Sequence, residues 1–339
     1  MRKFLLVGIV LLLSIIFSVA SYVWHEADHF LRLPPEDPGK DVVVTIESGW
    51  TFEQIARALE AVGVVRNGRY LVLLGKWRNR GASLPAGEFK LSTGWVPDRV
   101  LNHLTTAKPI LYRLSIHEGM TWWETAKVVE ESGFSSFDEF KRFVHDREFL
   151  AQQGMPFDSA EGFLFPETYL FKRPTGRETR QVIELFFRTF REHAARIWPN
   201  GLPLADELRR VVTLASLVEK ESAVAAERIR IAGVYRARIS RGMLLQCDPT
   251  VIYGLGLLFD GNLKRRHLED ASNRYNTYVH LGWPPGPICS PGRAALQAAV
   301  CPESTQYLYF VATGNGNHHF STTLSEHNRA VYKYQIKKK

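Results

Sequence analysis

The sequence predicts an α+β protein with a membrane anchor helix, a small α/β subdomain and then a mainly helical domain with a small β element. Three patterns lead to this fold class: a long apolar run at the N-terminus, a strand-turn-helix pattern that occurs twice, and amphipathic helical patterns followed by a glycine-rich hairpin signal. The 339 residues are 45% hydrophobic and 23% charged, which excludes a largely disordered chain.

The N-terminus has the composition of a membrane span. Residues 4–24 carry no charge and are mostly Leu, Ile, Val and Phe, enough for a helix of about 30 Å. Basic residues before the run and acidic ones after it predict a single pass, with residues 1–3 in the cytoplasm and the remainder outside. A cleaved signal peptide is the alternative, because Ser18-Val19-Ala20 has the pattern of a cleavage site. The apolar run continues beyond Ala20 to spanning length, which favours a retained anchor. The Pro-rich, charged residues that follow predict a linker over 25–41.

Net charge and export from the cytoplasm together limit the classes of binding partner. Lys and Arg outnumber Asp and Glu by 43 to 35, a formal charge of +8 that suits an anionic partner. Because the chain leaves the cytoplasm in either interpretation of the N-terminus, we expect an anionic polymer of the cell envelope and no nucleic acid. The three cysteines, Cys247, Cys289 and Cys301, are too few for a disulfide scaffold.

A strand, a turn and a helix recur 70 residues apart. Residues 44–51 (VTIESGWT) align with residues 114–121 (LSIHEGMT), and Thr51 is the expected N-cap of the helix that follows, where Ala56 falls on Ala126. We therefore expect one module over 42–110 and a second repeat with connecting helices over 111–160. The module is either a duplicated structural element or a binding module for a polymer, whose tryptophans could stack on sugar rings.

The rest of the chain, 161–339, predicts a mainly helical domain. Helical patterns cover 178–198, 208–222 and 225–241, and two short strands at 307–312 and 318–322 flank a Gly-Asn-Gly-Asn turn. In the second helix, a helical projection places Glu221 beside Leu214 and Glu219 beside Val212, both leaning onto the apolar arc. Thr213, Ser216 and Lys220 occupy the opposite, polar side.

A glutamate next to apolar neighbours can hold a proton near neutral pH, as a general acid must. Alternatively, one or both glutamates sit at the edge of the arc and pair with an arginine of the next helix, Arg228 or Arg230. The sequence leaves both interpretations open.

Three segments mix hydrogen-bonding groups with aromatic rings, as a sugar-lined cleft requires. The alternative is an ordinary surface loop rich in Pro and Gly. No metal-ligand spacing occurs among the eleven histidines, so no metal site is expected. The candidate substrate-binding residues in these segments are Gln246, Asp248, Thr250, Tyr253, Tyr275, Asn276, Tyr278, Pro285 and Gly286.

The same segments carry a family resemblance over nearly all of the chain. The sequence resembles the endolytic murein transglycosylase (YceG-like) family through a series of motifs in register. These are EGFLFPETY (161–169), LASLVEKES (214–222), LQCDPTVIYG (245–254), YNTY (275–278), GWPPGPI (282–288), SPG (290–292), LYFVA (308–312) and EHN (326–328).

The resemblance implies a single-pass protein of the inner (cytoplasmic) membrane, with a LysM-like subdomain over 42–110 and a catalytic domain over 161–339 on the periplasmic or extracytoplasmic side. Such enzymes cut nascent peptidoglycan strands between N-acetylmuramic acid and N-acetylglucosamine without water, leaving 1,6-anhydro ends. Glu221 followed by Ser222 matches the pair that carries the catalytic acid, with Glu219 as second choice and Ser222 as a further substrate contact. No metal or cofactor is implied, and penicillin-binding synthases are the implied partners.

Two positions depart from the family pattern, because Cys247 stands where a small polar residue such as Thr is expected and Glu167 where Asp is common, and neither is expected to touch the proposed acid. A non-catalytic peptidoglycan-binding scaffold and a muramidase-type hydrolase are the alternative functions.

Overall fold

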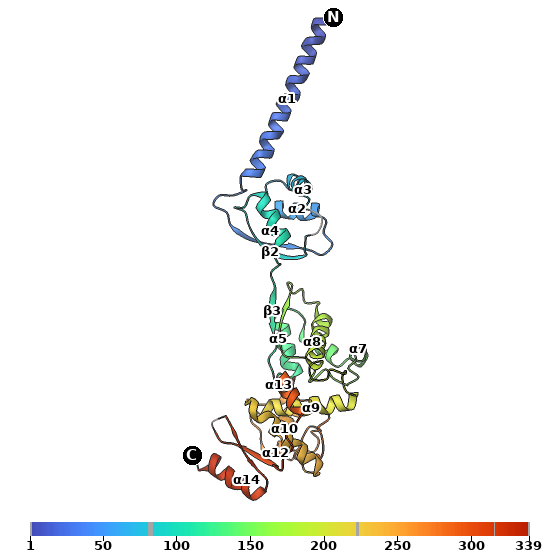
Figure 1. Cartoon of the computed structure of the whole chain (residues 1–339), viewed down its shortest axis with the longest axis vertical. Coiled ribbons are helices and arrows are strands. Elements are labelled where there is room, and N and C mark those ends of the chain that lie inside the picture. Colours follow the sequence, from blue (N-terminus) through green and yellow to red (C-terminus); the bar gives the residue numbers. More distant parts are fainter. Residues whose placement is uncertain (1, 81–83, 222–223, 315, 338–339) are drawn as a thin grey trace. The chain divides into compact units, whose positions relative to one another are not determined.

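The computed structural model describes residues 2–80, 84–221, 224–314 and 316–337, with only the backbone of residues 2–7. The chain divides into two compact units (Figure 1). Unit 1 comprises Met1–Tyr112 and Leu170–Arg173, and unit 2 comprises Arg113–Tyr169 and Pro174–Lys339. The fold is α+β as expected, since helices dominate both units and the strands form small two-stranded sheets.

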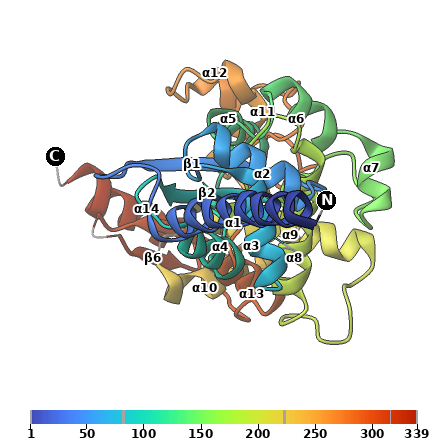
Figure 2. The same cartoon turned by 90° about the horizontal axis from the view of Figure 1, so that it is seen from above.

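Unit 1 consists of an apolar helix followed by a β-α-α-β arrangement and a further helix. The first and last strands of this arrangement pair antiparallel, from Asp41 opposite Ser92 to Ile46 opposite Gly87 (Figure 2). Its elements are α1 (Arg2–Arg32), β1 (Asp41–Ile46), α2 (Phe52–Ala61), α3 (Gly68–Trp77), β2 (Gly87–Ser92) and α4 (Pro97–Thr106). Within α1, Gly8–Arg32 is long and apolar enough to cross a membrane, with a mean hydropathy of 1.9 over its best window. The helix is therefore compatible with a single-pass anchor.

The end of α1 belongs to the hydrophobic core of unit 1. Phe30 is buried together with residues of β1, α2, α3 and α4, and Trp50 is half-buried against the same core. The helix thus continues through residues 25–32, which the sequence had assigned to the linker. It stops at Arg32 because Pro34 and Pro35 follow.

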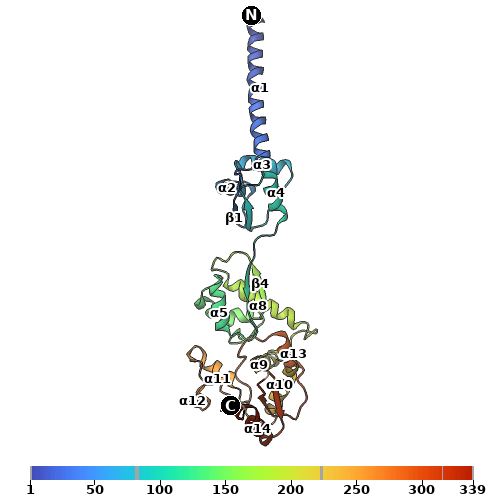
Figure 3. The same ribbon diagram turned by 90° about the vertical axis from the view of Figure 1, so that its left-hand side faces the viewer.

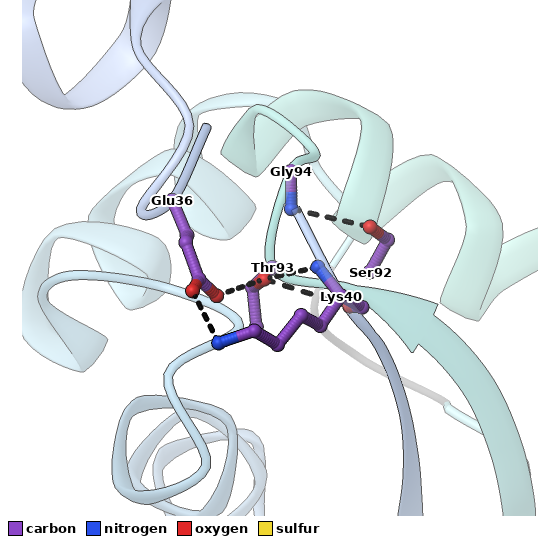
Figure 4. A network of polar contacts seen from close by, with 5 residues as sticks. All are labelled: Glu36, Lys40, Ser92, Thr93 and Gly94. Atoms are coloured by element: carbon purple, nitrogen blue, oxygen red, sulfur yellow. Dashed lines mark hydrogen bonds and ion pairs between the residues drawn. The ribbon is translucent and has the colours of Figure 1, made fainter. Parts of the chain in front are cut away.

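Polar contacts tie the Pro-rich segment to the turn after β2 (Figure 4). The Lys40 ammonium lies 2.7 Å from a carboxylate oxygen of Glu36, and the Thr93 hydroxyl donates to the other oxygen at 2.8 Å. The backbone N–H of Lys40 donates in turn to the Thr93 hydroxyl at 2.8 Å. The segment is therefore attached to unit 1 at its C-terminal end.

The strand-turn-helix pattern recurs as the sequence predicted. Thr51 caps α2 and Thr121 caps α5 (Trp122–Glu131), and each closes a capping box with the side chain three residues later. The preceding turns contain Gly49 and Gly119, with φ angles of 86° and 79°. In the second repeat, β3 (Tyr112–Ser115) pairs with β4 (Thr168–Phe171). As with β1 and β2, the strand before the helices thus pairs with the strand after them.

Unit 2 is mainly helical and carries one β-hairpin beyond β3 and β4. Its remaining elements are α6 (Phe137–Val144), α7 (Arg147–Gln152), α8 (Thr179–Ala194), α9 (Ala205–Glu221), α10 (Ala225–Ser240), α11 (Asp248–Leu255), η1 (Gly256–Leu258), α12 (Arg265–Leu268), α13 (Arg293–Val300), β5 (Tyr309–Ala312), β6 (His318–Ser321), α14 (Leu324–Val331) and η2 (Tyr332–Ile336). The predicted hairpin is confirmed, because β5 and β6 pair antiparallel with Tyr309 opposite Ser321.

The core of unit 2 surrounds α9. This helix packs against α10 and α13, and the three lie next to one another in Figures 1 and 3. The prediction that Thr213, Ser216 and Lys220 form a polar side of α9 is wrong for two of the three. Thr213 and Ser216 are as buried as the apolar residues, whereas Lys220 is exposed. The Ser216 hydroxyl donates to the carbonyl of Thr213 and accepts the N–H of Ile288 at 3.0 Å. Residues 212–218 of α9 are thus covered by protein on both sides of the helix.

Candidate active site

A cleft of about 590 Å³ opens in unit 2 where the C-terminal end of α9 meets the β5–β6 hairpin. It combines carboxyl groups, imidazoles and hydroxyl groups with aromatic rings. Its lining comprises Glu221, Tyr235, Arg238, Leu245, Gln246, Asp248, Pro249, Tyr278, Tyr309, Phe310, Val311, Ala312, His318, Leu324, His327, Asn328, Val331 and Gln335. Four of the sequence candidates are among them: Glu221, Gln246, Asp248 and Tyr278.

Glu221 is the last residue of α9, and its carboxyl group faces this cleft. The Tyr235 hydroxyl donates to its Oε1 at 3.1 Å, and the Cys247 thiol donates to the same atom at 3.3 Å. Burial raises the pKa of Glu221, and nearby Asp248 raises it further, against the lowering by Cys247, Tyr235 and His318. The C-terminal end of the helix also disfavours a negative charge. The environment thus favours a protonated carboxyl group.

Cys247 stays a neutral thiol in this position. It is 1% exposed, and burial raises the pKa of its thiol well above the ordinary value, with the charge of Glu221 adding to the effect. A neutral thiol keeps its proton and can donate a weak hydrogen bond. The expectation that neither departure from the family pattern touches the proposed acid is therefore wrong for Cys247, because the segments that carry Cys247 and Glu221 meet only in the folded chain.

A strained turn presents Cys247 to Glu221. Gln246 has a φ of 55°, an uncommon conformation for a residue with a side chain. The N–H groups of Gln246 and Cys247 donate to the carbonyl and the hydroxyl of Thr277, at 3.1 and 2.9 Å. Thr250 donates to the carbonyl of Cys247 at 2.7 Å and lies 2.9 Å from the Thr277 hydroxyl. Thr250 is thus buried behind the turn and does not line the cleft.

Asp248 and Tyr278 form a polar pair in the cleft. The Tyr278 hydroxyl donates to Oδ1 of Asp248 at 2.5 Å. The loop that carries Tyr278 is held by the buried amide of Asn276, which donates to the carbonyls of His267, Leu268 and Asp270. Asn276 therefore supports the cleft without lining it.

Glu219 lies outside the lining of the cleft and is held on both oxygens. Its Oε1 is 3.2 Å from the guanidinium of Arg228, and its Oε2 accepts the N–H of Gly292 at 2.9 Å. Burial raises its pKa, while the Gly292 N–H and Arg228 oppose the shift. For Glu219 the structure therefore has the alternative that the sequence left open, an ion pair with Arg228. Arg230 pairs with Glu303 instead.

Tyr253 and Tyr275 belong to a second cluster in unit 2. The Tyr253 ring lies 4.7 Å from Tyr275 and 5.0 Å from Trp123. Nearby Glu161 accepts the N–H of Trp122 at 2.9 Å, and burial raises the pKa of Glu161 to about 8.

The remaining candidates also lie away from the cleft. Gly286 is buried near the Tyr275 hydroxyl and Pro285 is exposed. None of the candidates in this cluster lines the cleft, and Ser222 lies outside the described residues.

Tyr235, Arg238 and His318 also line the cleft and make hydrogen bonds there, and none of them was a sequence candidate. The carboxylate of Glu227 accepts both the backbone N–H of His318, at 2.9 Å, and its ring Nδ1–H, at 2.7 Å. Glu227 thus orients the His318 ring in the cleft. The available signal was the pair His318-His319 in the hairpin, which was considered only for metal binding.

Comparison with known proteins defines the class of protein first. The YceG-like family matches residues 44–333, which is most of the chain, and this chain belongs to that family.

Individual relatives align with most of this chain. The endolytic murein transglycosylase of Bacillus subtilis (strain 168) is 30% identical over 318 residues, covering 89% of this chain and 87% of the relative. The endolytic murein transglycosylase of Streptococcus pneumoniae serotype 2 is 28% identical over 324 residues, and this chain spans 58% of its length. Among solved structures, a putative YceG-like protein from Listeria monocytogenes is 30% identical with a TM-score of 0.57, covering 86% of this chain and 99% of that one.

Proposed function

We propose that this protein is a membrane-anchored endolytic murein transglycosylase, with Glu221 as its single acid and base. The observation that carries the proposal is a half-buried carboxyl group with a raised pKa at the wall of a polar and aromatic cleft. The names of the relatives supply the substrate class, because murein is a glycan polymer whose glycosidic bonds need acid assistance to break.

The chemistry needs one carboxyl group used twice. Protonated Glu221 donates its proton to the glycosidic oxygen between N-acetylmuramic acid and N-acetylglucosamine as that bond breaks. The carboxylate left behind then accepts the proton of the muramic acid C6 hydroxyl as this oxygen attacks C1. The product is a 1,6-anhydro end, and no water is consumed. A hydrolase of the two-carboxylate type would need a second carboxylate at the scissile bond.

Glu219 suits this task less well than Glu221. Both of its oxygens accept hydrogen bonds that stabilise the charged form, from Arg228 and from Gly292. Asp248, Tyr278, Gln246 and His318 would hold sugar hydroxyl and acetamido groups, and Tyr309 and Phe310 offer apolar ring faces.

The remaining parts of the chain suit a protein of the cell envelope. Helix α1 would anchor it in the cytoplasmic membrane with residues 1–3 inside, leaving the chain from about residue 25 onward on the outer side. The β-α-α-β arrangement of unit 1 would act as a LysM-like module that holds nascent glycan strands. Penicillin-binding synthases, which make those strands, are the proposed protein partners.

The test is mass spectrometry of fragments released from purified peptidoglycan by the full-length protein. We expect anhydro-muramyl ends, lighter than hydrolysis products by one water. Glu221→Gln should lower the rate by about 10²- to 10⁴-fold, because the proton donor is lost. Glu219→Gln is the matched control on the same helix, and it should keep the activity of whatever fraction is folded.

Other results would replace the proposal. Reducing ends in place of anhydro ends would identify a muramidase-type hydrolase. Release of no fragments by the folded, membrane-reconstituted protein would leave the scaffold function. Loss of activity in folded Glu219→Gln with retention in Glu221→Gln would transfer the acid role to Glu219.

A further inference from the structure

An apolar groove of about 250 Å³ lies in unit 1 between the end of α1 and α3. It is lined by Val23, Ala27, Phe30, Leu31, Tyr70, Leu73, Leu74 and Trp77. Phe30 and Leu74 are each 5% exposed, and the Phe30 ring meets Tyr70 edge-on at 5.5 Å. The two helices are thus joined through this groove by packed side chains.

Part of the groove remains exposed on the protein itself. Leu73 is 61% exposed and Trp77, one turn further along α3, is 72% exposed. These two large apolar side chains lie on a helix whose other face is buried in the core of unit 1. Exposure of such neighbouring side chains to water is unfavourable, and it marks a surface that another apolar phase covers.

The groove is continuous with the membrane span. Val23 belongs to the uncharged run 4–24 and also lines the groove, together with residues four, seven and eight positions later on α1. A helix of 31 residues rises about 46 Å, which exceeds the roughly 30 Å of the hydrocarbon core. When residues 4–24 span the bilayer, residues 25–32 therefore lie at the level of the lipid headgroups. Leu73 and Trp77 line the same groove and lie at that level too.

The charges around α3 are those of a surface that faces anionic groups. Between Glu60 and Glu88 the chain has five basic residues and no Asp or Glu. They are Arg66, Arg69, Lys76, Arg78 and Arg80, all exposed, and Arg78 is paired with Asp98 of α4 at 3.1 Å. The Arg78 guanidinium lies 4.7 Å from the centre of the Trp77 ring. A tryptophan beside Lys and Arg is typical of the membrane-water interface, where the ring meets the acyl boundary and the cations meet phosphates.

We propose that unit 1 rests on the membrane through this surface of α1 and α3, the α1–α3 surface. Leu73 and Trp77 enter the interface of the bilayer that α1 spans, and the basic residues of α3 and the turn after it contact anionic lipid headgroups. The inference rests on the membrane anchor of the proposed function and is independent of its chemistry. It places unit 1 directly on the bilayer surface, where newly made glycan emerges.

The test uses full-length protein with an environment-sensitive fluorophore on a single introduced cysteine. Cys301→Ser removes the exposed native thiol, while Cys247 and Cys289 are buried. The probe is placed by Leu73→Cys in the groove, by Ile16→Cys within the span, or by Val43→Cys on β1. Val43 is 52% exposed and lies outside the groove, so it is the matched control. The purified protein is reconstituted into vesicles of phosphatidylcholine and phosphatidylglycerol.

We expect the Leu73 probe to emit at shorter wavelength and to be quenched by lipids that carry a quencher, as the Ile16 probe is. The Val43 probe should behave as in water. The blue shift should persist as protein is diluted with lipid. Phosphatidylglycerol should increase the blue shift, and the double variant Arg69→Gln/Lys76→Gln should reduce that increase. The exposed α2 residue Arg57 provides the control substitution, Arg57→Gln.

Each failure has a distinct meaning. A Leu73 probe that matches Val43 while the Ile16 probe is buried would overturn the inference and leave the anchor intact. A Leu73 shift that vanishes on dilution with lipid would overturn it in favour of contact between two copies of the chain. An Ile16 probe in water would overturn the anchor and the inference together. Murein cleavage is not a readout, so a failure of the proposed chemistry affects none of these outcomes.

Discussion

Glu221 is the residue on which the proposed chemistry depends, and its neighbours decide whether it carries a proton. Burial favours the neutral acid, while the Cys247 thiol, the Tyr235 hydroxyl and His318 favour the carboxylate and Asp248 opposes it. A thiol is a weaker donor than a hydroxyl, so Cys247 stabilises the carboxylate less than the threonine of the family pattern would. The balance suits a group that must first donate a proton and then accept one.

Substitution of Cys247 should shift the pH dependence of activity. A general acid works only while protonated, so activity falls as the pH rises through the pKa of Glu221. Cys247→Ala removes a donor to the carboxylate, so the pKa of Glu221 should rise and the falling limb should move to higher pH. Cys247→Ser supplies a stronger donor and should move the limb to lower pH. The measurement is kcat/KM against pH, and a shift in the same direction for both variants would contradict the assignment.

The candidate site was only partly predictable at this scale. The helical projection indicated that both Glu219 and Glu221 approach the apolar arc, but it could not tell which of them meets Arg228 and which meets the cleft. Arg228 comes from α10, and the wall facing Glu221 comes partly from the β5–β6 hairpin, about 100 residues further along the chain. Such pairings depend on tertiary contacts that periodicity does not contain.

At the scale of elements, α9 is held in position by loops from distant parts of the chain. The Ile288 N–H and the Cys289 thiol bond to Ser216, and Glu161–Gly162 contacts both α5 and α9. Helix boundaries and caps were largely predictable, because capping residues and prolines act locally. The two-sided burial of α9 was not, because the loops that cover Thr213 and Ser216 carry no periodic signal.

Gly162 is a close-contact point between elements. Its φ is 87°, and a Cβ atom there would lie 2.6 Å from Cβ of Pro287 and 2.7 Å from Cγ1 of Val212 on α9. Gly162→Ala should therefore lower the free energy of unfolding by about 3 kcal/mol, from backbone strain and overpacking together. The matched control is Gly154→Ala, where φ is 70° and nothing lies within 4 Å, and there we expect about 1 kcal/mol. Denaturant titrations that give equal losses would refute the packing argument.

Glu161 should make stability depend on pH. It accepts the N–H of Trp122, the first residue of α5, and burial raises its pKa to about 8. Between its unfolded pKa near 4.5 and about 8, the folded state keeps a proton that the unfolded state releases, so stability falls as the pH rises through this window. Glu161→Gln cannot ionise, and its melting temperature should drop less between pH 5 and pH 8 than that of the wild type. An unchanged drop would mean that this carboxyl group ionises normally.

At the scale of the whole molecule, the chain combines an apolar helix, a β-α-α-β unit and a larger helical unit with a cleft. Phe30 belongs to the hydrophobic core of unit 1, whereas residues 8–24 of the uncharged run before it are exposed. The span and the folded part of unit 1 are therefore largely separate, and they meet where Val23 lines the groove with α3. The proposed function uses this separation, since a bond in an insoluble polymer is cut by a protein fixed in the membrane.

Deletion of residues 2–24 should release the protein from the membrane without unfolding it. We expect the shortened chain in the soluble fraction with an unchanged melting temperature, while the full chain resists extraction by high salt and by alkaline carbonate. Intact-mass measurement of the membrane-bound form separates a retained anchor from cleavage after Ala20. A full chain that is extracted by salt alone would contradict the spanning role of α1.

The sequence by itself determined the apolar anchor helix, the recurring strand-turn-helix pattern with its threonine caps, the hairpin and the helix that carries both glutamates. These features follow from local rules of hydropathy, periodicity and capping, which act over a few neighbouring residues. Only the tertiary structure decided that Glu221 faces a cleft while Glu219 is held by Arg228 and Gly292, that Cys247 donates to Glu221, and that Thr250 and Asn276 support the cleft from behind. The physical reason is that burial, and with it the pKa of a carboxyl group, is set by elements far apart in the chain that meet only when it folds.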